Sequence, residues 1–264
     1  MHGPGLHRLI HPAAVIDPGA ALAPGVEVGP FAVIGAGVQI GAGTRVGPHV
    51  VIRGPTRIGC DNRIFQFASV GEDPQDMKYG GEETRLEIGD RNQIRECATL
   101  HRGTVQDQGV TRIGNDNLFM AYTHVAHDCR IGDHVIMANA ASLGGHVQIE
   151  DWAILGGFTI VHQFCRLGAH SFCAMGSALS RDVPPYVTVG GHPAAPHGIN
   201  SEGLRRRGFS PAAIAAIKRA YRALYLAGLK LDEALERIRG LAAEAPEVAA
   251  FAAFVADSSR SIVR

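Results

Sequence analysis

The chain carries a six-residue repeat of aliphatic side chains, which constrains its fold more than any other feature. Ile, Leu or Val occupies ten consecutive positions spaced six residues apart, from Ile16 to Val70. The repeat resumes over 88–100 and, displaced by one residue, over 113–179. Of the 25 positions counted in this way, only Phe119, Met137 and Cys173 are not Ile, Leu or Val. A helix repeats every ~3.6 residues and a strand about every two, so neither explains a period of six.

A short fixed repeat is typical of a solenoid, in which each unit buries its apolar face only by stacking on its neighbours. Three six-residue units make one 18-residue triangular coil, with the aliphatic residue pointing inward and glycine or a small polar residue at the corner. The pattern resembles the hexapeptide-repeat family. That resemblance implies a mainly β protein, folded as a left-handed parallel β-helix.

Two interruptions and one change of composition divide the chain. The repeat is lost over 71–87, and Leu100 and Ile113 are 13 residues apart where 12 would keep the frame. We therefore predict a β-helix over 1–195 with inserted loops at about 71–87 and 103–112. Helix signals follow, namely Ser210-Pro211 at a start, Gly228 at an end, and further starts at Asp232 and Pro246. They predict a small α-helical domain over 196–264 that caps the open end of the solenoid.

Composition excludes several classes of function. The 25 Lys and Arg residues balance 25 Asp and Glu, so no net field favours nucleic acid or a membrane surface. The sequence has no basic start followed by an apolar stretch and no membrane-length apolar run, so we expect a cytoplasmic protein that does not span a membrane. The five cysteines form no C-x-x-C pair. We expect Cys129, Cys165 and Cys173 to be buried, reduced thiols.

Folding the sequence into 18-residue coils gathers a polar patch. His127 and Asp128 fall below Gly145 and His146, and the next coil adds His162 and Gln163. The alternative is a row of solvated corner residues in which histidine is merely tolerated. A histidine oriented by a carboxylate can act as a general base near neutral pH. Because no serine or cysteine nucleophile accompanies the patch, it favours direct transfer over a covalent intermediate.

Six segments carry a closer resemblance. The chain is similar to the UDP-N-acetylglucosamine acyltransferase family, which starts lipid A synthesis, at Ile94–Glu96, Leu100–Thr104, His124–Cys129, Val161–Phe164, Asp182–Tyr186 and Asn200–Phe209. The resemblance implies that His127 is the general base for the glucosamine 3-hydroxyl, that Asp128 orients it, and that Gly145 supplies an oxyanion donor. It also implies sites for the sugar nucleotide or the acyl donor at Asp76, Lys78, His101, His124, His146, His162, Gln163, Asn200, Glu202, Arg206 and Arg207.

The same resemblance implies the partners. The acyl donor is a 3-hydroxyacyl chain on the phosphopantetheine of acyl carrier protein, the enzyme needs no cofactor of its own, and the assembly is a homotrimer. Acyl carrier proteins are acidic, so docking should use a basic surface. The basic residues near the start of the helical domain suit this, although an ordinary polar helix face is equally compatible: Arg205, Arg206, Arg207, Lys218, Arg219 and Arg222.

Met175 corresponds to the family position that limits acyl-chain length. It lies 48 residues beyond His127, about 2.7 coils, which is roughly 13 Å along the axis at about 4.8 Å per coil. An extended chain of about ten carbons would span that distance at ~1.3 Å per carbon. We therefore predict a 3-hydroxydecanoyl donor. The alternative is that Met175 fills a gap in the core.

Two other functions remain open from the sequence. One is zinc-dependent hydration, as in γ-class carbonic anhydrases on the same solenoid, with His124, His127 and His146 as ligands. The other is a purely structural β-helix. Whether a 3-amino analogue of the sugar nucleotide also serves as acceptor is open as well.

Overall fold

The computed structural model describes residues 9–242 and 245–264. Residues 1–8 of the predicted solenoid lie outside the described part. Contacts separate two compact units, 1–129 and 130–264, both built from short parallel strands. Over the described ranges, no helix is both long and apolar enough to cross a membrane.

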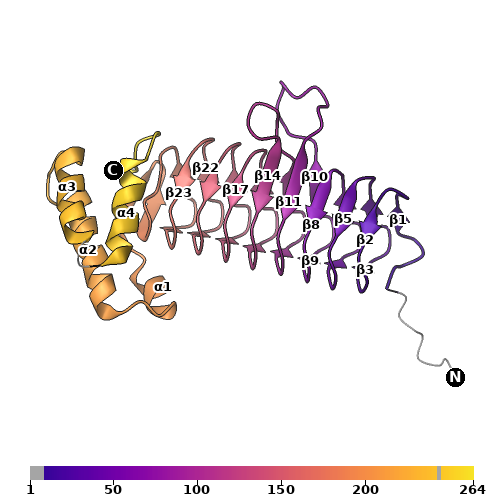
Figure 1. Cartoon of the computed structure of the whole chain (residues 1–264), viewed down its shortest axis with the longest axis horizontal. Coiled ribbons are helices and arrows are strands. Elements are labelled where there is room, and N and C mark those ends of the chain that lie inside the picture. Colours follow the sequence, from indigo (N-terminus) through magenta and orange to yellow (C-terminus); the bar gives the residue numbers. More distant parts are fainter. Residues whose placement is uncertain (1–8, 243–244) are drawn as a thin grey trace. The chain divides into compact units, whose positions relative to one another are not determined.

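Unit 1 forms a coil of short strands (Figure 1), and these strands make three faces, each a parallel sheet. One face holds β1 (Val15–Ile16), β4 (Val33–Ile34), β7 (Val51–Ile52), β10 (Ser69–Glu72), β13 (Thr99–His101) and β16 (His124–Val125). The second holds β2 (Ala21–Leu22), β5 (Val38–Ile40), β8 (Thr56–Ile58), β11 (Arg85–Ile88) and β14 (Val110–Ile113). The third holds β3 (Glu27–Val28), β6 (Arg45–Val46), β9 (Arg63–Ile64), β12 (Gln93–Ile94) and β15 (Leu118–Phe119).

The repeat positions build the core as predicted. Ile16 pairs with Ile34, and Ile34 with Ile52, one 18-residue coil apart. Ile34 and Ile52 are fully buried, so each coil completes the apolar interior of the next.

The corners agree with the expectation in part. Glycine holds the left-handed backbone at some of them, as at Gly37 (φ 71°), and large residues hold it at others, as at Phe31 (φ 59°) and Phe67 (φ 63°), each more than half exposed. Glycine directly after the repeat position has a different role, because it allows close approach of coils. A Cβ on Gly41 would lie 2.5 Å from the backbone of Gly59 in the next coil.

The two insertions change the stacking distance along the sequence. Val70 pairs with Leu100, 30 residues on, and Leu100 pairs with Val125, 25 residues on. Although Val70 and Ile88 are 18 residues apart, they lie on different faces, because residues 73–84 leave the coil as a loop. Strand pairing continues to Glu72, resumes at Arg85, and begins again at Val110 after the second loop, 102–109.

Unit 2 continues the same design and ends in helices. Its faces hold β19 (Ser142–Leu143), β22 (Ile160–Val161) and β25 (Ala178–Leu179); β17 (Arg130–Ile131), β20 (Gln148–Ile149) and β23 (Arg166–Leu167); and β18 (Ile136–Met137), β21 (Ile154–Leu155), β24 (Phe172–Cys173), β26 (Val187–Gly191) and the antiparallel β27 (Ala194–Ile199). The helices are α1 (Ser201–Arg206), α2 (Pro211–Tyr225), α3 (Leu231–Ala242) and α4 (Pro246–Ala256).

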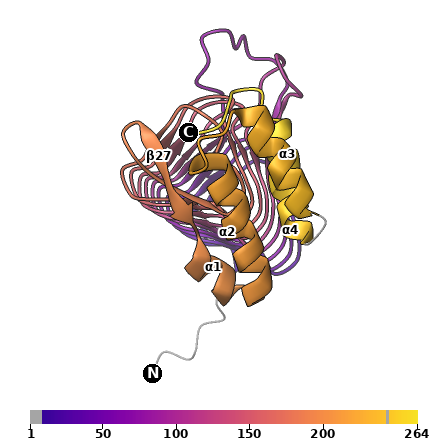
Figure 2. The ribbon, with the colours of Figure 1, turned by 90° about the vertical axis from the view of Figure 1, so that its left-hand side faces the viewer.

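The helical segment covers the last strands of unit 2. The Ser210 side chain caps α2 by accepting a hydrogen bond from the backbone N–H of Ala213 (3.1 Å), with proline at the first helical position as predicted. Helix α2 contacts β27, α3 and α4 (Figure 2). Near the C-terminus, the N–H of Val263 donates to the carbonyl of Asp182 (2.8 Å). These contacts agree with a cap over this end of the coil, while the predicted boundary at 195/196 stays a prediction.

The predicted thiol burial is confirmed. Cys129, Cys165 and Cys173 are fully buried, and none of the three is in a disulfide within the described part of the chain. Burial raises the pKa of Cys165 to about 11 and that of Cys173 to about 12.

Candidate functional site

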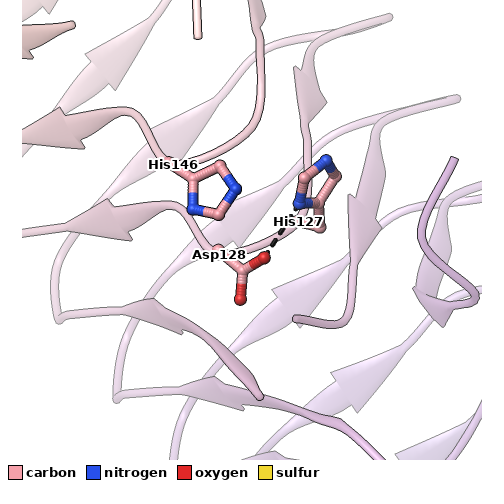
Figure 3. A group of neighbouring side chains, drawn as sticks. All are labelled: His127, Asp128 and His146. Atoms are coloured by element: carbon pink, nitrogen blue, oxygen red, sulfur yellow. Dashed lines mark hydrogen bonds and ion pairs between the residues drawn. The ribbon is translucent and has the colours of Figure 1, made fainter. Parts of the chain in front are cut away.

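His127 and Asp128 form the centre of the site in unit 1. The Nδ1 of His127 lies 2.9 Å from the Oδ2 of Asp128, and the carboxylate side chain is 1% exposed. Figure 3 draws this hydrogen bond, together with His146, which belongs to unit 2. A carboxylate only accepts hydrogen bonds, so Nδ1 carries a proton, and in the neutral form of the ring Nε2 then keeps the lone pair.

Thr104 holds that carboxylate in place. Its backbone N–H donates to both oxygens of Asp128 (2.9 and 3.1 Å), and its hydroxyl donates to Oδ2 (2.6 Å). The N–H of Asp128 donates to the hydroxyl of Thr111 (2.8 Å). Asp128 itself has a left-handed backbone (φ 60°), which this network stabilises. Sequence reasoning gave Thr104 no role, because it lies 24 residues from Asp128, across an insertion.

His101 and His124 lie beside the pair. Their rings meet edge to face with centroids 5.1 Å apart. The Nδ1 of His124 lies 2.7 Å from the hydroxyl oxygen of Thr99. The Nδ1 of His101 is buried and has no hydrogen-bond partner within the described part of the chain. Burial lowers the pKa of His101, and burial together with the neighbouring histidines lowers that of His124 to about 4.

These two histidines predict a loss of stability in acid. In the unfolded chain His124 takes up a proton near its ordinary pKa of 6.5, whereas in the fold it does so only near 4. Protonation therefore favours the unfolded chain as pH falls through that window, and below it the contribution is constant. Urea unfolding at pH 7 and 4.5 should show His124→Gln losing less stability than the wild type, by on the order of 2 kcal/mol. Equal losses in both proteins would contradict this.

Asp76 and Lys78 lie on the 73–84 loop. The Asp76 carboxylate accepts a hydrogen bond from the Lys78 backbone N–H (3.0 Å), and the Lys78 side chain is exposed. The loop projects from the coil at the level of β10 and β11 (Figure 1). A charged side chain at the tip of such a loop is free to meet a ligand.

Unit 2 contributes the other predicted residues from its own corners. His146 stacks on Phe164 with ring centroids 4.4 Å apart. His162 and Gln163 are exposed, and the Nδ1 of His162 lies 3.2 Å from an Nη of Arg260. Gly145 is buried, and its carbonyl accepts from the N–H of Phe164 (3.0 Å). The predicted stacking of this set over His127 and Asp128 stays a prediction.

Residues of α1 divide into two kinds. Asn200 caps the helix by accepting from the Gly203 N–H (3.1 Å), and Glu202 pairs with Arg206 (3.0 Å) in solvent. Arg207 instead lies over the ring of Trp152, 5.0 Å from its centroid, and an Nη is 3.3 Å from the Nδ1 of His170. Burial lowers the pKa of the Arg207 guanidinium. The two arginines thus have different environments, and the sequence gave no sign of the aromatic platform at Trp152.

Comparisons with known proteins show which families and proteins this chain is similar to. Residues 24–54 and 111–145 match the family described as "Bacterial transferase hexapeptide (six repeats)", and residues 182–263 match "Udp N-acetylglucosamine O-acyltransferase; Domain 2". The acyl-[acyl-carrier-protein]–UDP-N-acetylglucosamine O-acyltransferase of Halorhodospira halophila is 57% identical over 255 residues, covering 97% of this chain and 99% of that protein. The protein of that name from Alkalilimnicola ehrlichii is 61% identical over 255 residues, with the same coverage.

Solved structures of UDP-N-acetylglucosamine acyltransferases are similar to this chain over nearly its whole length. LpxA from Acinetobacter baumannii superposes with a TM-score of 0.95 at 49% identity, covering 97% of this chain and all of that one. The UDP-N-acetylglucosamine acyltransferase of Arabidopsis gives 0.87 at 37% identity, with the same coverage.

The fold and the repeats define a hexapeptide-repeat transferase. Over nearly its whole length, the chain belongs to the UDP-N-acetylglucosamine O-acyltransferase family. The predicted family is thereby confirmed, as is the fold class, a left-handed parallel β-helix followed by a small α-helical region. The zinc-hydration alternative is not favoured by these relatives.

Proposed function

We propose that the protein transfers a 3-hydroxyacyl chain from acyl carrier protein to the 3-hydroxyl of UDP-N-acetylglucosamine, the first step of lipid A synthesis. The observation that carries the proposal is the His127–Asp128 pair with its Nδ1 proton fixed. It occurs in a chain 57% identical to a protein named for this activity.

His127 would act as the general base through Nε2. It takes the proton of the 3-hydroxyl as the oxygen attacks the thioester carbonyl, giving a tetrahedral intermediate. The C–S bond then breaks, and the imidazolium returns the proton to the departing sulfur. Asp128 stabilises the imidazolium, since its carboxylate is buried and fixed by Thr104. The backbone N–H of Gly145 is our candidate donor to the oxyanion.

The acceptor would bind through groups from the first insertion, from strands of the coil and from its corners. Asp76 and Lys78 offer a carboxylate and an ammonium from the 73–84 loop, and His101 and His124 offer neutral imidazoles. Arg206 is the exposed cation suited to a phosphate oxygen, while Arg207 is held against Trp152. The remaining predicted contacts are His146, His162, Gln163, Asn200 and Glu202.

The experiment that tests the function uses three donors. The purified protein is incubated with UDP-N-acetylglucosamine and acyl carrier protein carrying ten-, twelve- or fourteen-carbon 3-hydroxyacyl chains, and products are identified by mass. We expect an O-acylated sugar nucleotide, fastest with the ten-carbon donor and with no added cofactor. A parallel reaction with the 3-amino sugar nucleotide tests the acceptor atom. No acylated product with any donor would contradict the proposal.

Acyl carrier protein would dock on the basic side of the helices. A groove between α2 and α3 is lined by Arg219, Arg222 and Arg237 around an apolar floor that includes Leu226. We expect Arg222→Glu to raise the KM for the donor about tenfold at low salt, with a smaller effect at high salt. Lys230→Glu makes the same charge change on an exposed residue outside the groove lining and serves as control. Equal effects of the two variants would argue against this surface.

We also infer a homotrimer, as in hexapeptide transferases generally. An exposed row of stacked rings on unit 1, Phe31–His49–Phe67, with centroids 5.1 and 5.3 Å apart, offers an apolar contact for a second copy. Sedimentation equilibrium should give three times the chain mass for the wild type and a smaller mass for Phe31→Glu/Phe67→Glu. An active wild-type monomer would contradict the inference.

A further inference from the structure

Arg102 is a buried cation next to the site that the proposed chemistry does not use. It follows His101 directly at the start of the second loop, and its side chain is only 10% exposed. Burial lowers the pKa of its guanidinium, an effect that Glu72 partly offsets. A buried guanidinium is retained only where hydrogen-bond partners compensate the loss of water.

Its side-chain partners come from two separate segments of unit 1. One terminal nitrogen of Arg102 donates to the carbonyl of Gly54, in the turn between β7 and β8. The other donates to the carboxylate of Asp73, where the 73–84 loop leaves the coil, and to the hydroxyl of Tyr79 further along the loop (3.1 Å). The Arg102 guanidinium therefore joins the coil, at Gly54, to two points of the 73–84 loop, Asp73 and Tyr79.

Tyr79 connects Arg102 to the rest of the 73–84 loop through two further hydrogen bonds. Its hydroxyl donates to the carbonyl of Glu82 (2.8 Å), and its backbone N–H donates to the carbonyl of Asp76 (3.0 Å). The Asp76 carboxylate in turn accepts from the N–H of Lys78 (3.0 Å). Asp76 and Lys78 thus belong to a turn that ends at the residue held by Arg102.

We propose that Arg102 is a positioning residue of the acceptor subsite. It fixes the 73–84 loop so that Asp76 and Lys78 are already in place when the sugar nucleotide arrives. A preorganised loop spares the ligand the cost of ordering it, so the effect belongs to acceptor binding and not to the chemical step. This inference rests on the proposed function.

The same four-residue segment would then serve both halves of the site. His101 lies beside the His127–Asp128 pair, and Thr104 donates hydrogen bonds to Asp128. Arg102, between them in the chain, donates instead to the 73–84 loop. Hydrogen bonds to a charged group are stronger than neutral ones, so the contacts of Arg102 with Asp73 and Tyr79 restrain the loop more than neutral contacts would.

The test separates loop order from activity. In Arg102→Met, we expect amide hydrogen exchange over 73–84 to accelerate about tenfold or more. We expect the KM for UDP-N-acetylglucosamine to rise about tenfold, with kcat at saturating acceptor and the donor KM within about twofold. Arg102→Lys keeps the charge with one donor group and should recover part of the loss.

Arg112→Met serves as a control, and Tyr79→Phe is a second test of the same contact. Arg112→Met removes an arginine of the adjoining strand that binds Glu87 and Gln108 and does not touch the loop, so it should leave loop exchange and the acceptor KM unchanged. Tyr79→Phe removes only the hydroxyl on the surface loop, cannot unfold the core, and should reproduce the change in a weaker form. It decides the matter if Arg102→Met does not fold.

Unchanged exchange over 73–84 in a folded variant would overturn the proposal. Faster exchange with an unchanged acceptor KM would overturn it too. If the wild type fails to acylate UDP-N-acetylglucosamine, the proposed function falls and the acceptor role falls with it, while the exchange data still show whether Arg102 orders the loop.

Discussion

Replacing His127 by alanine should lower kcat/KM by about three orders of magnitude while leaving the fold intact. A positioned general base contributes about 10²- to 10⁴-fold, and within residues 9–129 the imidazole that meets the Asp128 carboxylate is that of His127. The effect should fall on kcat, because the imidazole takes its proton in the transition state. Steady-state assays with the ten-carbon donor measure both constants.

The fold should tolerate this change because the His127 side chain lies at a corner. It is 13% exposed and contributes no aliphatic position to the core. Circular dichroism and thermal unfolding should therefore match the wild type within a few degrees. His11→Ala, which removes an exposed histidine of the first coil, is the control and should keep full activity. Activity of His127→Ala within about tenfold of the wild type would rule out the general-base role.

Asp128→Asn refines the same test. An amide can donate to Nδ1, which would move the imidazole proton to Nε2 and leave no base facing the acceptor. We expect a loss approaching that of His127→Ala. Thr104→Val, which removes one of the donors to Asp128, should cost less, because the backbone N–H of Thr104 still holds the carboxylate.

Much of the architecture is predictable from the repeat because one physical constraint sets it. Every third aliphatic position stacks on its counterpart one coil away, as Ile16, Ile34 and Ile52 do. Handedness required the resemblance, since burial of an aliphatic residue is equally satisfied by either hand. The adjacency of His127 and Asp128 needed no folding at all, because the two are neighbours in the chain.

What the sequence missed lies across the insertions. Thr104 reaches Asp128 over 24 residues, and Arg102 reaches Gly54 over 48, so neither follows an 18-residue rule. The spacing of Val70 and Ile88 was misleading for the same reason, since 12 extra loop residues equal two repeat units and preserve the frame without adding a coil. Arg102 and Thr104 are both readable in the sequence, but the residues that they bind are not.

Replacing Met175 by glycine should change the acyl-chain-length preference of the enzyme. The residue follows β24 and is 77% exposed, which argues against a gap filler in the core and leaves its side chain available to an acyl chain. We propose that it stops a ten-carbon chain. In Met175→Gly, a fourteen-carbon donor could extend past this position and bury about four more methylenes, each worth about 0.8 kcal/mol. The ratio of kcat/KM for the fourteen-carbon donor to that for the ten-carbon donor should then rise about 100-fold.

The variant should lose little stability, because an exposed side chain contributes little packing. Met175→Leu is the matched control, since it keeps the bulk and should keep the ten-carbon preference. Competition between donors in one reaction, with products separated by mass, gives the ratio directly. A wild type that prefers the fourteen-carbon donor would refute the assignment, as would a Met175→Gly variant whose chain-length preference equals that of Met175→Leu. Either result would mean that Met175 does not set the chain length.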